Sequence, residues 1–293
     1  MAGSISESCA TATERTLRRK EREENFPVAL RALPRELRAD LLAVYDVARV
    51  IDDLGDQAAG DRIALLEGFG LDLAAVWEGG RPEHPVLRRL MPAVRARALD
   101  REPFECLLRA NLLDQRVTRY KTYSQLREYC VLSAEPIGRI VLAVFGVCSP
   151  AAIGYSDRVC AALQLIEHWQ DVAEDRRAGR VYLPQQDLVA FGVAEADLDA
   201  VVASAALRSL MAFQTKRAAD LLDSGAALVG MLHGWARLAV AGYLAGGRAA
   251  LDALRRVDGD VLSGSPPARR RDVLWHLTRL LVGWPGWRGG RAQ

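Results

Sequence analysis

The chain has 293 residues, half of them apolar, which is enough to bury a sizeable core. Its 39 basic residues nearly balance its 37 acidic ones, so the net charge of +2 excludes a global field that would attract nucleic acid. No stretch approaches the roughly 18 uncharged apolar residues of a membrane-spanning helix. The five cysteines contain no C-x-x-C pair, which favours reduced thiols and a cytoplasmic location.

The pattern along the chain is almost entirely helical. Residues 1–20 are polar and are predicted to form a disordered leader. After them, Ala, Leu, Arg and Glu dominate, and apolar residues recur at intervals of three and four. Breaks between the helical segments are too short to be linkers, so residues 21–293 are predicted to form one all-α domain. The predicted helices cover residues 37–56, 61–77, 84–98, 103–115, 124–132, 135–147, 156–177, 196–223, 226–254 and 270–282.

The predicted helix 37–56 carries a polar row on one face. Tyr45, Arg49, Asp52 and Asp56 follow one another at spacings of four, three and four residues, so their side chains share that face. Two carboxylates one turn apart repel each other by about a few tenths of a kcal/mol when exposed, and by more when buried. A cation between them would relieve this repulsion.

A second row, Gln164, Glu167, Asp171 and Asp175, repeats this arrangement on the predicted helix 156–177. Either row alone is equally compatible with a solvated face that forms salt bridges. Apolar neighbours flank both rows, however, and both contain the D-x-x-x-D spacing, which favours inward-facing carboxylates. Oxygen ligands of this kind suit Mg²⁺, which bridges carboxylates to substrate phosphates. The two rows together therefore predict a magnesium and diphosphate site.

The residues that form these rows also carry a family resemblance. YDVARVIDDLGD (45–56) and ALQLIEHWQDVAEDRRAGRVYLP (162–184) resemble the two aspartate-rich signatures of squalene and phytoene synthases, the head-to-head prenyl transferases. The similarity continues through RYKTYSQLREYCVLSAEPIGRI (119–140) and covers roughly residues 21–255. The opening ENFPVALRALPRELR (24–38) is most similar to the HpnC branch of hopanoid biosynthesis, the hydroxysqualene synthases. This resemblance implies an isoprenoid synthase helical bundle around a central cavity.

The resemblance also implies roles for individual residues. The metal ligands implied are Asp52, Asp56, Glu167, Asp171 and Asp175. The diphosphate contacts implied are Arg49, Arg180 and Tyr182, to which we add Gln164 of the second row. Tyr45 and Tyr129 match tyrosines close to the reacting carbons, and the ring of Phe26 is expected to help stabilise a carbocation.

The sequence departs from the family signatures at three places. Glu167 replaces a common Asn, which adds a negative charge to the second row. Gln170 replaces a common basic residue, and Glu24–Pro27 replaces a serine-containing element. These departures affect the expected number of bound metal ions and the first phosphate contacts.

The HpnC resemblance implies a magnesium-dependent ionisation of presqualene diphosphate. Water then quenches the cation, and hydroxysqualene and diphosphate are released within squalene and hopanoid biosynthesis. The same residues allow the condensation of two prenyl diphosphates to presqualene diphosphate, squalene or phytoene. A third alternative is a non-catalytic helical assembly factor, against which the retention of all four aspartates argues.

The C-terminal segment 268–290 combines an arginine cluster with Trp275, Trp284 and Trp287. This composition suits peripheral contact with the inner membrane, into which a lipid product would leave. It equally suits a helix that closes the bundle. Functional coupling to other squalene and hopanoid pathway enzymes is a further expectation, and nucleic acid is not an expected partner.

Overall fold

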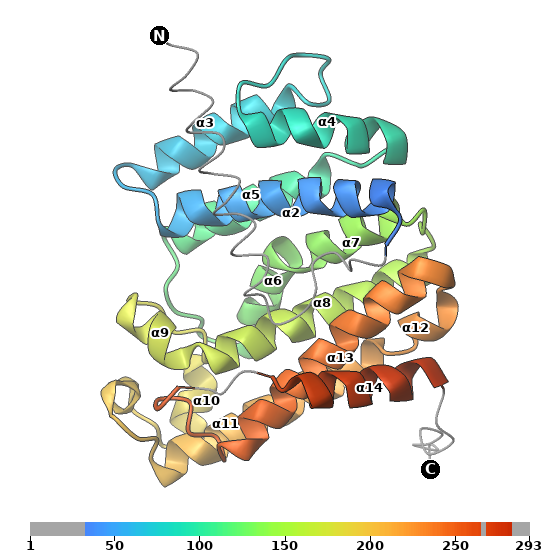
Figure 1. Cartoon of the computed structure of the whole chain (residues 1–293). Helices are drawn as coiled ribbons and strands as arrows, with labels where there is room; N and C mark the ends of the chain where they lie inside the picture. Colours follow the sequence, from blue (N-terminus) through green and yellow to red (C-terminus); the bar gives the residue numbers. More distant parts are fainter. Residues whose placement is uncertain (1–32, 265–267, 283–293) are drawn as a thin grey trace.

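The computed structural model describes residues 33–264 and 268–282. Within these ranges the regular elements are helices, accompanied by one isolated bridge between Arg119 and Val181. The all-α class predicted from the sequence is therefore confirmed (Figure 1). The helices are α2 (Arg35–Asp56), α3 (Arg62–Ala74), α4 (Pro85–Arg97), α5 (Glu102–Asp114), α6 (Tyr123–Ser133), α7 (Glu135–Val144), α8 (Pro150–Gln170), α9 (Val172–Arg177), α10 (Gln185–Ala190), the 3₁₀ helix η1 (Glu195–Asp199), α11 (Ala205–Gly225), α12 (Leu228–Met231), α13 (Gly234–Arg256) and α14 (Arg270–Val282).

The helix starts follow from local side-chain chemistry. Pro34 directly precedes α2, since its fixed φ suits the residue before a first helical turn. Side-chain oxygen atoms accept hydrogen bonds from free backbone N–H groups at the starts of three other helices. The residues that supply these caps are Asp61 for α3, Thr122 for α6 and Ser149 for α8.

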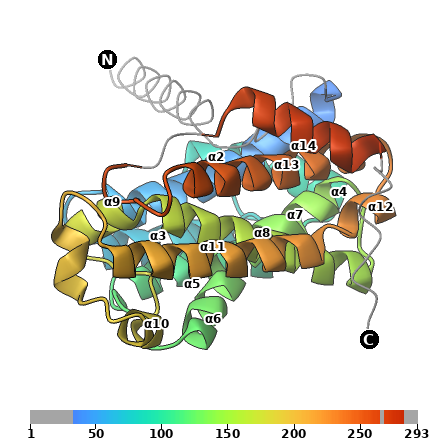
Figure 2. The same ribbon diagram turned by 90° about the horizontal axis from the view of Figure 1, so that it is seen from below.

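Two apolar clusters organise the bundle. One joins α2 to α5 with part of α7 and buries Leu66, Leu87 and Phe104 completely. The other joins α6 to the helices that follow, with Trp169 and Leu244 at its centre. Figures 1 and 2 show α8, α11 and α13 side by side, while α2 lies with α3, α4 and α5 in the other part of the molecule. The two clusters therefore leave room for a cavity between α2 and α8.

Three predicted helices have wrong boundaries. The helix predicted over 156–177 begins earlier, at Pro150, and breaks at Asp171, where φ is −99° and ψ is 13°. The helix predicted over 196–223 is instead η1 and α11, because Ser204 caps a new helix start. Likewise the helix predicted over 226–254 is divided by the extended residues Leu232 and His233. The short helix α10 was not predicted.

Some sequence predictions fall outside the described residues, namely the leader 1–20, the aromatic Phe26 and the end of the segment 268–290. Within the described part of the chain, no helix combines the length and apolar character required to cross a membrane. The prediction that 21–293 forms one domain stays a prediction.

Candidate active site

A cavity of about 400 Å³ lies between the two parts of the bundle. Along α2 its lining changes from Leu41 and Val44 to Asp52 and Asp56, and along α8 from apolar side chains to Glu167. Because α2 and α8 run in the same direction (Figure 1), the acidic ends of the two linings come together. The cavity thus has an acidic end and an apolar interior. Its apolar residues include Leu41, Val44, Ile137, Val141, Leu142, Val159, Leu163, Leu228 and Val240.

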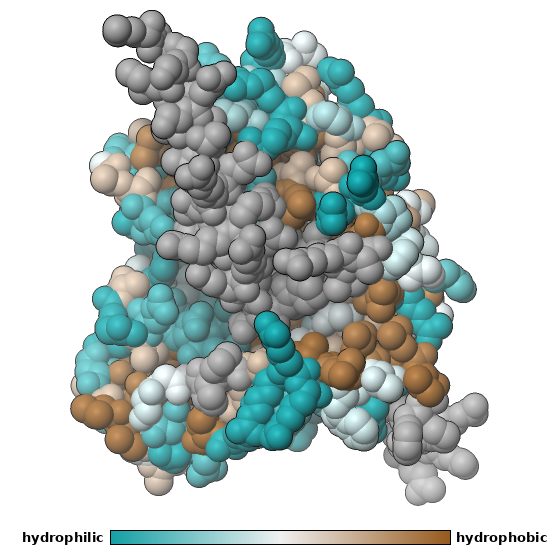
Figure 3. Space-filling view, viewed as in Figure 1, coloured by the Kyte–Doolittle hydropathy of each residue, from teal (hydrophilic) through white to brown (hydrophobic). Residues whose placement is uncertain are grey.

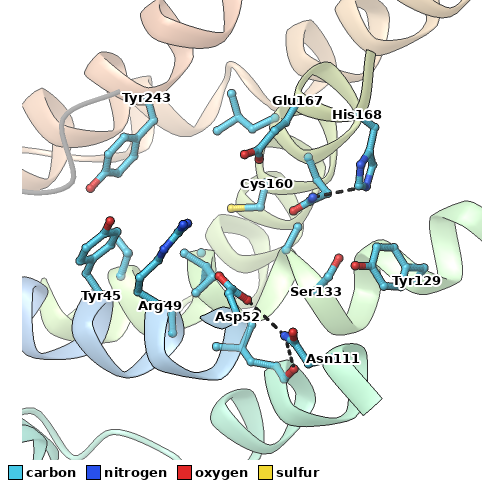
Figure 4. A pocket seen from close by; sticks show the side chains of 18 of the residues that line it. Tyr45, Arg49, Asp52, Asn111, Tyr129, Ser133, Cys160, Glu167, His168 and Tyr243 are labelled. Carbon is cyan, nitrogen blue, oxygen red and sulfur yellow. Dashed lines mark hydrogen bonds between the residues drawn. The ribbon is translucent and has the colours of Figure 1, made fainter. Parts of the chain in front are cut away.

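All the predicted site residues within the described chain line this cavity. They come from α2, α6, α8, α9 and the loop after α9, so segments more than a hundred residues apart in sequence meet here. Figure 4 shows several of them directed toward a shared space. The residues are Tyr45, Arg49, Asp52, Asp56, Tyr129, Gln164, Glu167, Asp171, Asp175, Arg180 and Tyr182.

Asp52 is the best-supported carboxylate of the first row. Its Oδ1 accepts a hydrogen bond of 3.1 Å from Nδ2 of Asn111 on α5, and Asn111 is itself fixed by a bond to the Leu107 carbonyl. Asp52 is exposed at the cavity surface, and neighbouring protein atoms displace part of the water from its carboxylate. This desolvation raises the pKa of Asp52 to about 6, although Asn111 and Arg49 act in the opposite direction. A cation bound beside Asp52 would favour its ionised form.

The second row stays aligned even though the helix breaks at Asp171. The Asp171 N–H donates to the Glu167 carbonyl at 2.9 Å, and the Asp175 N–H donates to the Asp171 carbonyl at 2.8 Å. These i to i−4 bonds keep the three side chains at helical spacing across the junction of α8 and α9. Desolvation and the neighbouring carboxylates of Asp175 and Glu174 raise the pKa of Asp171 to about 6. The second row therefore also has excess negative charge.

Arg180 connects the two rows. Its Nη1 donates to Asp56 Oδ1 at 2.7 Å, while its backbone N–H donates to the Asp175 carbonyl. The preceding Gly179 has a φ of +84°, which allows the turn that directs Arg180 back toward the cavity. The Nε atoms of Arg180 and Arg49 are buried without a hydrogen-bond partner, although Arg49 Nε lies 3.4 Å from Asp53 Oδ1 in an ion pair. Both guanidinium groups therefore retain donors that an anion in the cavity can use.

A second set of ion pairs holds the loop that carries Arg180. Arg176 bonds to Glu195 and Asp199 with distances of 2.5 and 2.7 Å, and it does not line the cavity. Arg119 bonds to the same Glu195 and donates to the Gly179 carbonyl at 2.6 Å. These contacts fix the turn on which the position of Arg180 depends.

Asp114 and three rings form a cluster beside the acids. The Tyr129 hydroxyl donates to Asp114 Oδ2 at 2.6 Å, and the Tyr182 hydroxyl donates to Oδ1 at 3.3 Å. His168 stacks on Tyr182 with ring centroids 3.7 Å apart. Desolvation raises the pKa of Asp114 to about 6 and that of Tyr129 well above its usual value. The two phenols therefore remain protonated donors at neutral pH.

Sequence reasoning missed Asn111 and Asp114. Both lie on α5 and line the cavity, three residues apart in the otherwise apolar run ANLLD. Two polar residues on one face of an apolar helix were the available signal. That signal did not identify their partners, because Asp52 and Tyr129 come from other helices.

The donor set fits Mg²⁺ that is shared with a diphosphate. Among the described residues, no group of three His, Cys, Asp or Glu side chains converges as a complete metal site. The acids instead form two partial sets of carboxylate oxygens, with raised pKa values at Asp52 and Asp171 that a cation would offset. Mg²⁺ is commonly bound by one or two carboxylates, waters and substrate phosphates, and it does not require a cage made only of protein.

Comparisons with known proteins show the family to which the chain is similar. The model of the family described as squalene/phytoene synthase matches residues 19–277. A hydroxysqualene synthase of Rhodopseudomonas palustris is 35% identical over 218 residues, which are 73% of each chain. A presqualene diphosphate synthase of the same organism is 32% identical over 197 residues, covering 66% of this chain and 70% of the relative. The crystal structure of squalene synthase HpnC from Alicyclobacillus acidocaldarius is similar with a TM-score of 0.76 and 37% identity, over 85% of this chain and 95% of that one.

The family match includes both acidic rows, the helices that carry them and the cavity between them. The structural similarity confirms the predicted isoprenoid synthase bundle, and the predicted likeness to the HpnC branch is confirmed as well. The chain therefore belongs to the squalene/phytoene synthase family.

Proposed function

We propose that this protein ionises presqualene diphosphate with the aid of Mg²⁺ and adds water, which releases hydroxysqualene and diphosphate. The observation that carries the proposal is a single cavity in which two carboxylate rows and two arginines adjoin an apolar interior. A substrate with a dianionic or trianionic head and a long hydrocarbon body matches this division. Hydroxysqualene synthases among the chain's relatives, at 32 to 35% identity, support the choice of reaction.

The proposed metal ligands are the acids of the two rows, Asp52, Asp56, Glu167, Asp171 and Asp175. When bound, Mg²⁺ would stabilise the negative charge that develops on the leaving diphosphate. Arg49 and Arg180 contribute to the same end through their positive charge, and the buried Nε–H of Arg180 has no hydrogen-bond partner within the protein. The Nη1 of Arg180 is engaged with Asp56, so its Nε–H is the donor that has no hydrogen-bond partner within the protein.

The remainder of the cavity suits a carbocation. Its apolar side chains keep bulk water from the reacting carbons, while the ring faces of Tyr45 and Tyr129 offer negative electrostatic potential. Tyr129 is held in place by its 2.6 Å bond to Asp114. The proposed role of Phe26 lies outside the described residues.

Condensation of two prenyl diphosphates is the second candidate. The same acids and arginines would serve it, and the relative called presqualene diphosphate synthase is 32% identical. Incubation of the purified protein with Mg²⁺ and either presqualene diphosphate or farnesyl diphosphate, with and without NADPH, distinguishes the candidates by mass spectrometry. Hydroxysqualene from presqualene diphosphate alone is the expected product. Consumption of farnesyl diphosphate, or squalene that requires NADPH, would replace the proposal with a condensing or reducing enzyme.

We also propose that α14 contacts the inner membrane from the cytoplasmic side. The helix packs on α13 through the bonds Arg256–Asp272 and His276–Asp252, so it does close the bundle. Its outer face nevertheless exposes Leu274, Trp275 and Val282, with exposed arginines at 269–271. Figure 3 shows hydrophilic and hydrophobic surface next to each other in the lower part of the view. Flotation with anionic vesicles should recover the full chain, whereas a Leu274→Ser/Trp275→Ser variant should remain with the unbound protein. Equal flotation of the two proteins would contradict the membrane contact.

Functional coupling to other squalene and hopanoid pathway enzymes stays a prediction.

A further inference from the structure

Ser133 has an unused hydroxyl group inside the cavity. It is the last residue of α6, one helical turn after Tyr129, and it lines the cavity with Tyr129 (Figure 4). Its Oγ is shielded from solvent and has no hydrogen-bond partner. A serine within a helix commonly bonds to the carbonyl four residues earlier, but Ser133 does not. The hydroxyl is therefore a hydrogen-bonding group that the protein itself leaves unused.

The other polar side chains nearby have partners. Asn111 bonds to Asp52, the Tyr129 hydroxyl bonds to Asp114, and the Cys160 thiol interacts with Ser156. Among the described residues that line the cavity, the buried side-chain atoms without a hydrogen-bond partner are Nε of Arg49, which is ion-paired with Asp53, Nε of Arg180 and Oγ of Ser133. The two arginines suit the diphosphate. Ser133 carries one O–H donor and acceptor lone pairs, so it can bond to a water molecule in either direction.

Ser133 also lies at the boundary between the two parts of the lining. Tyr129 and its partner Asp114 precede it on the polar side, while Ile137 and Val141 follow on α7 on the apolar side. A carbocation formed by loss of the diphosphate would occupy this boundary, with its charge near the acidic end and its chains in the apolar interior. A water held by Ser133 would be close to such a cation and separated from bulk solvent.

We infer that Ser133 positions the water that attacks the cation, and so directs the reaction toward an alcohol. This inference rests on the proposed function. Ser133 Oγ accepts a hydrogen bond from the water, which leaves a lone pair on the water oxygen free to form the new C–O bond. The other proton of the water passes to the diphosphate released in the same cavity. The step requires no oxidant or reductant.

The test compares the wild-type protein with Ser133→Ala, Ser133→Thr and Ser156→Ala. Each is incubated with Mg²⁺ and presqualene diphosphate, and both released diphosphate and the organic products are measured. Ser133→Ala should release diphosphate within about 3-fold of the wild-type rate, because the acids and arginines are unchanged. Its alcohol share should fall by about 10-fold, with hydrocarbons formed by proton loss in its place.

Two variants serve as controls. Ser133→Thr retains a hydroxyl and should restore the alcohol. Ser156→Ala removes a hydroxyl already engaged by Cys160 and should give the wild-type product ratio. Thermal melting should show no loss of stability in Ser133→Ala, because its hydroxyl has no protein partner.

The outcomes separate the inference from the function. A wild-type share of alcohol from Ser133→Ala would overturn the water-positioning role while leaving the proposed function in place. Loss of diphosphate release in a folded Ser133→Ala protein would assign Ser133 to ionisation and would also overturn it. If the wild-type protein itself forms no alcohol, the proposed function is wrong.

Discussion

Asp52 combines the properties expected of a ligand-binding carboxylate. It faces the cavity, accepts a bond from Asn111 and has a pKa raised to about 6 by desolvation. In the absence of a cation these properties cost stability, because a carboxylate with little water around it must be ionised at neutral pH. We therefore infer that the residue is retained for function and not for the fold.

Replacement of this carboxylate should separate activity from stability. Asp52→Asn preserves the shape of the side chain and removes its charge, so diphosphate release should fall by about 100-fold or more. The melting temperature should not fall, because a desolvated charge is lost. Asp220→Asn is the matched control, since Asp220 forms an exposed pair with Lys216 on α11 and should keep full activity. Near-normal turnover by Asp52→Asn would contradict the metal assignment.

The raised pKa of Asp114 predicts how the stability of the protein depends on pH. Its pKa in the folded protein is raised to about 6, so between about pH 4 and 6 the folded state binds its proton more tightly than the unfolded chain does. The free energy of unfolding contributed by this group therefore falls as the pH rises through that range. Asp114→Asn has no proton to lose at this position. Its free energy of unfolding should therefore rise by about 1–3 kcal/mol, relative to that of the wild type, between pH 4 and pH 7. Urea unfolding of both proteins at pH 4 and pH 7 measures this change. The same difference in free energy of unfolding between variant and wild type at both pH values would contradict the prediction.

At the scale of the helices, the sequence predicted the two acidic rows but not the residues that form hydrogen bonds around them. The two rows were predictable because helical spacing places residues four apart on one face, whatever the tertiary structure. The break at Asp171 was not predictable, since the Glu167 to Asp175 run contains neither Gly nor Pro. The roles of Asn111 and Asp114 depend on how α5 packs against α2 and α6, which no local pattern encodes.

Close helix packing at Gly138 gives a prediction at this scale. A Cβ added at Gly138 would lie 2.5 Å from Cys160 Sγ and closer still to Ser156 Oγ, so these side chains would have to turn away or α7 would have to move from α8. Gly138→Ala should therefore destabilise the protein by about 1–3 kcal/mol. Gly68→Ala on the exposed face of α3 meets no atom within 4 Å and should stabilise by up to about 1 kcal/mol. Thermal or urea unfolding compares the two, and equal effects would be inconsistent with close packing at Gly138.

The whole molecule brings together segments that the sequence separates. Asp56 on α2 and Arg180 in the loop after α9 are 124 residues apart and meet at the acidic end of the cavity, where the proposed diphosphate would bind. The helical class and the apolar and acidic residues were predictable from composition and spacing. The resemblance to a known family supplied the arrangement that places them around one cavity, because the choice of helix neighbours depends on long-range packing.

Isotope labelling tests the proposed function. Presqualene diphosphate is incubated with the protein and Mg²⁺ in water enriched in ¹⁸O, without NADPH, and the lipid product is analysed by mass spectrometry. We expect hydroxysqualene that carries the heavy oxygen in its hydroxyl group. An unlabelled product, or no conversion of presqualene diphosphate by folded protein, would contradict it.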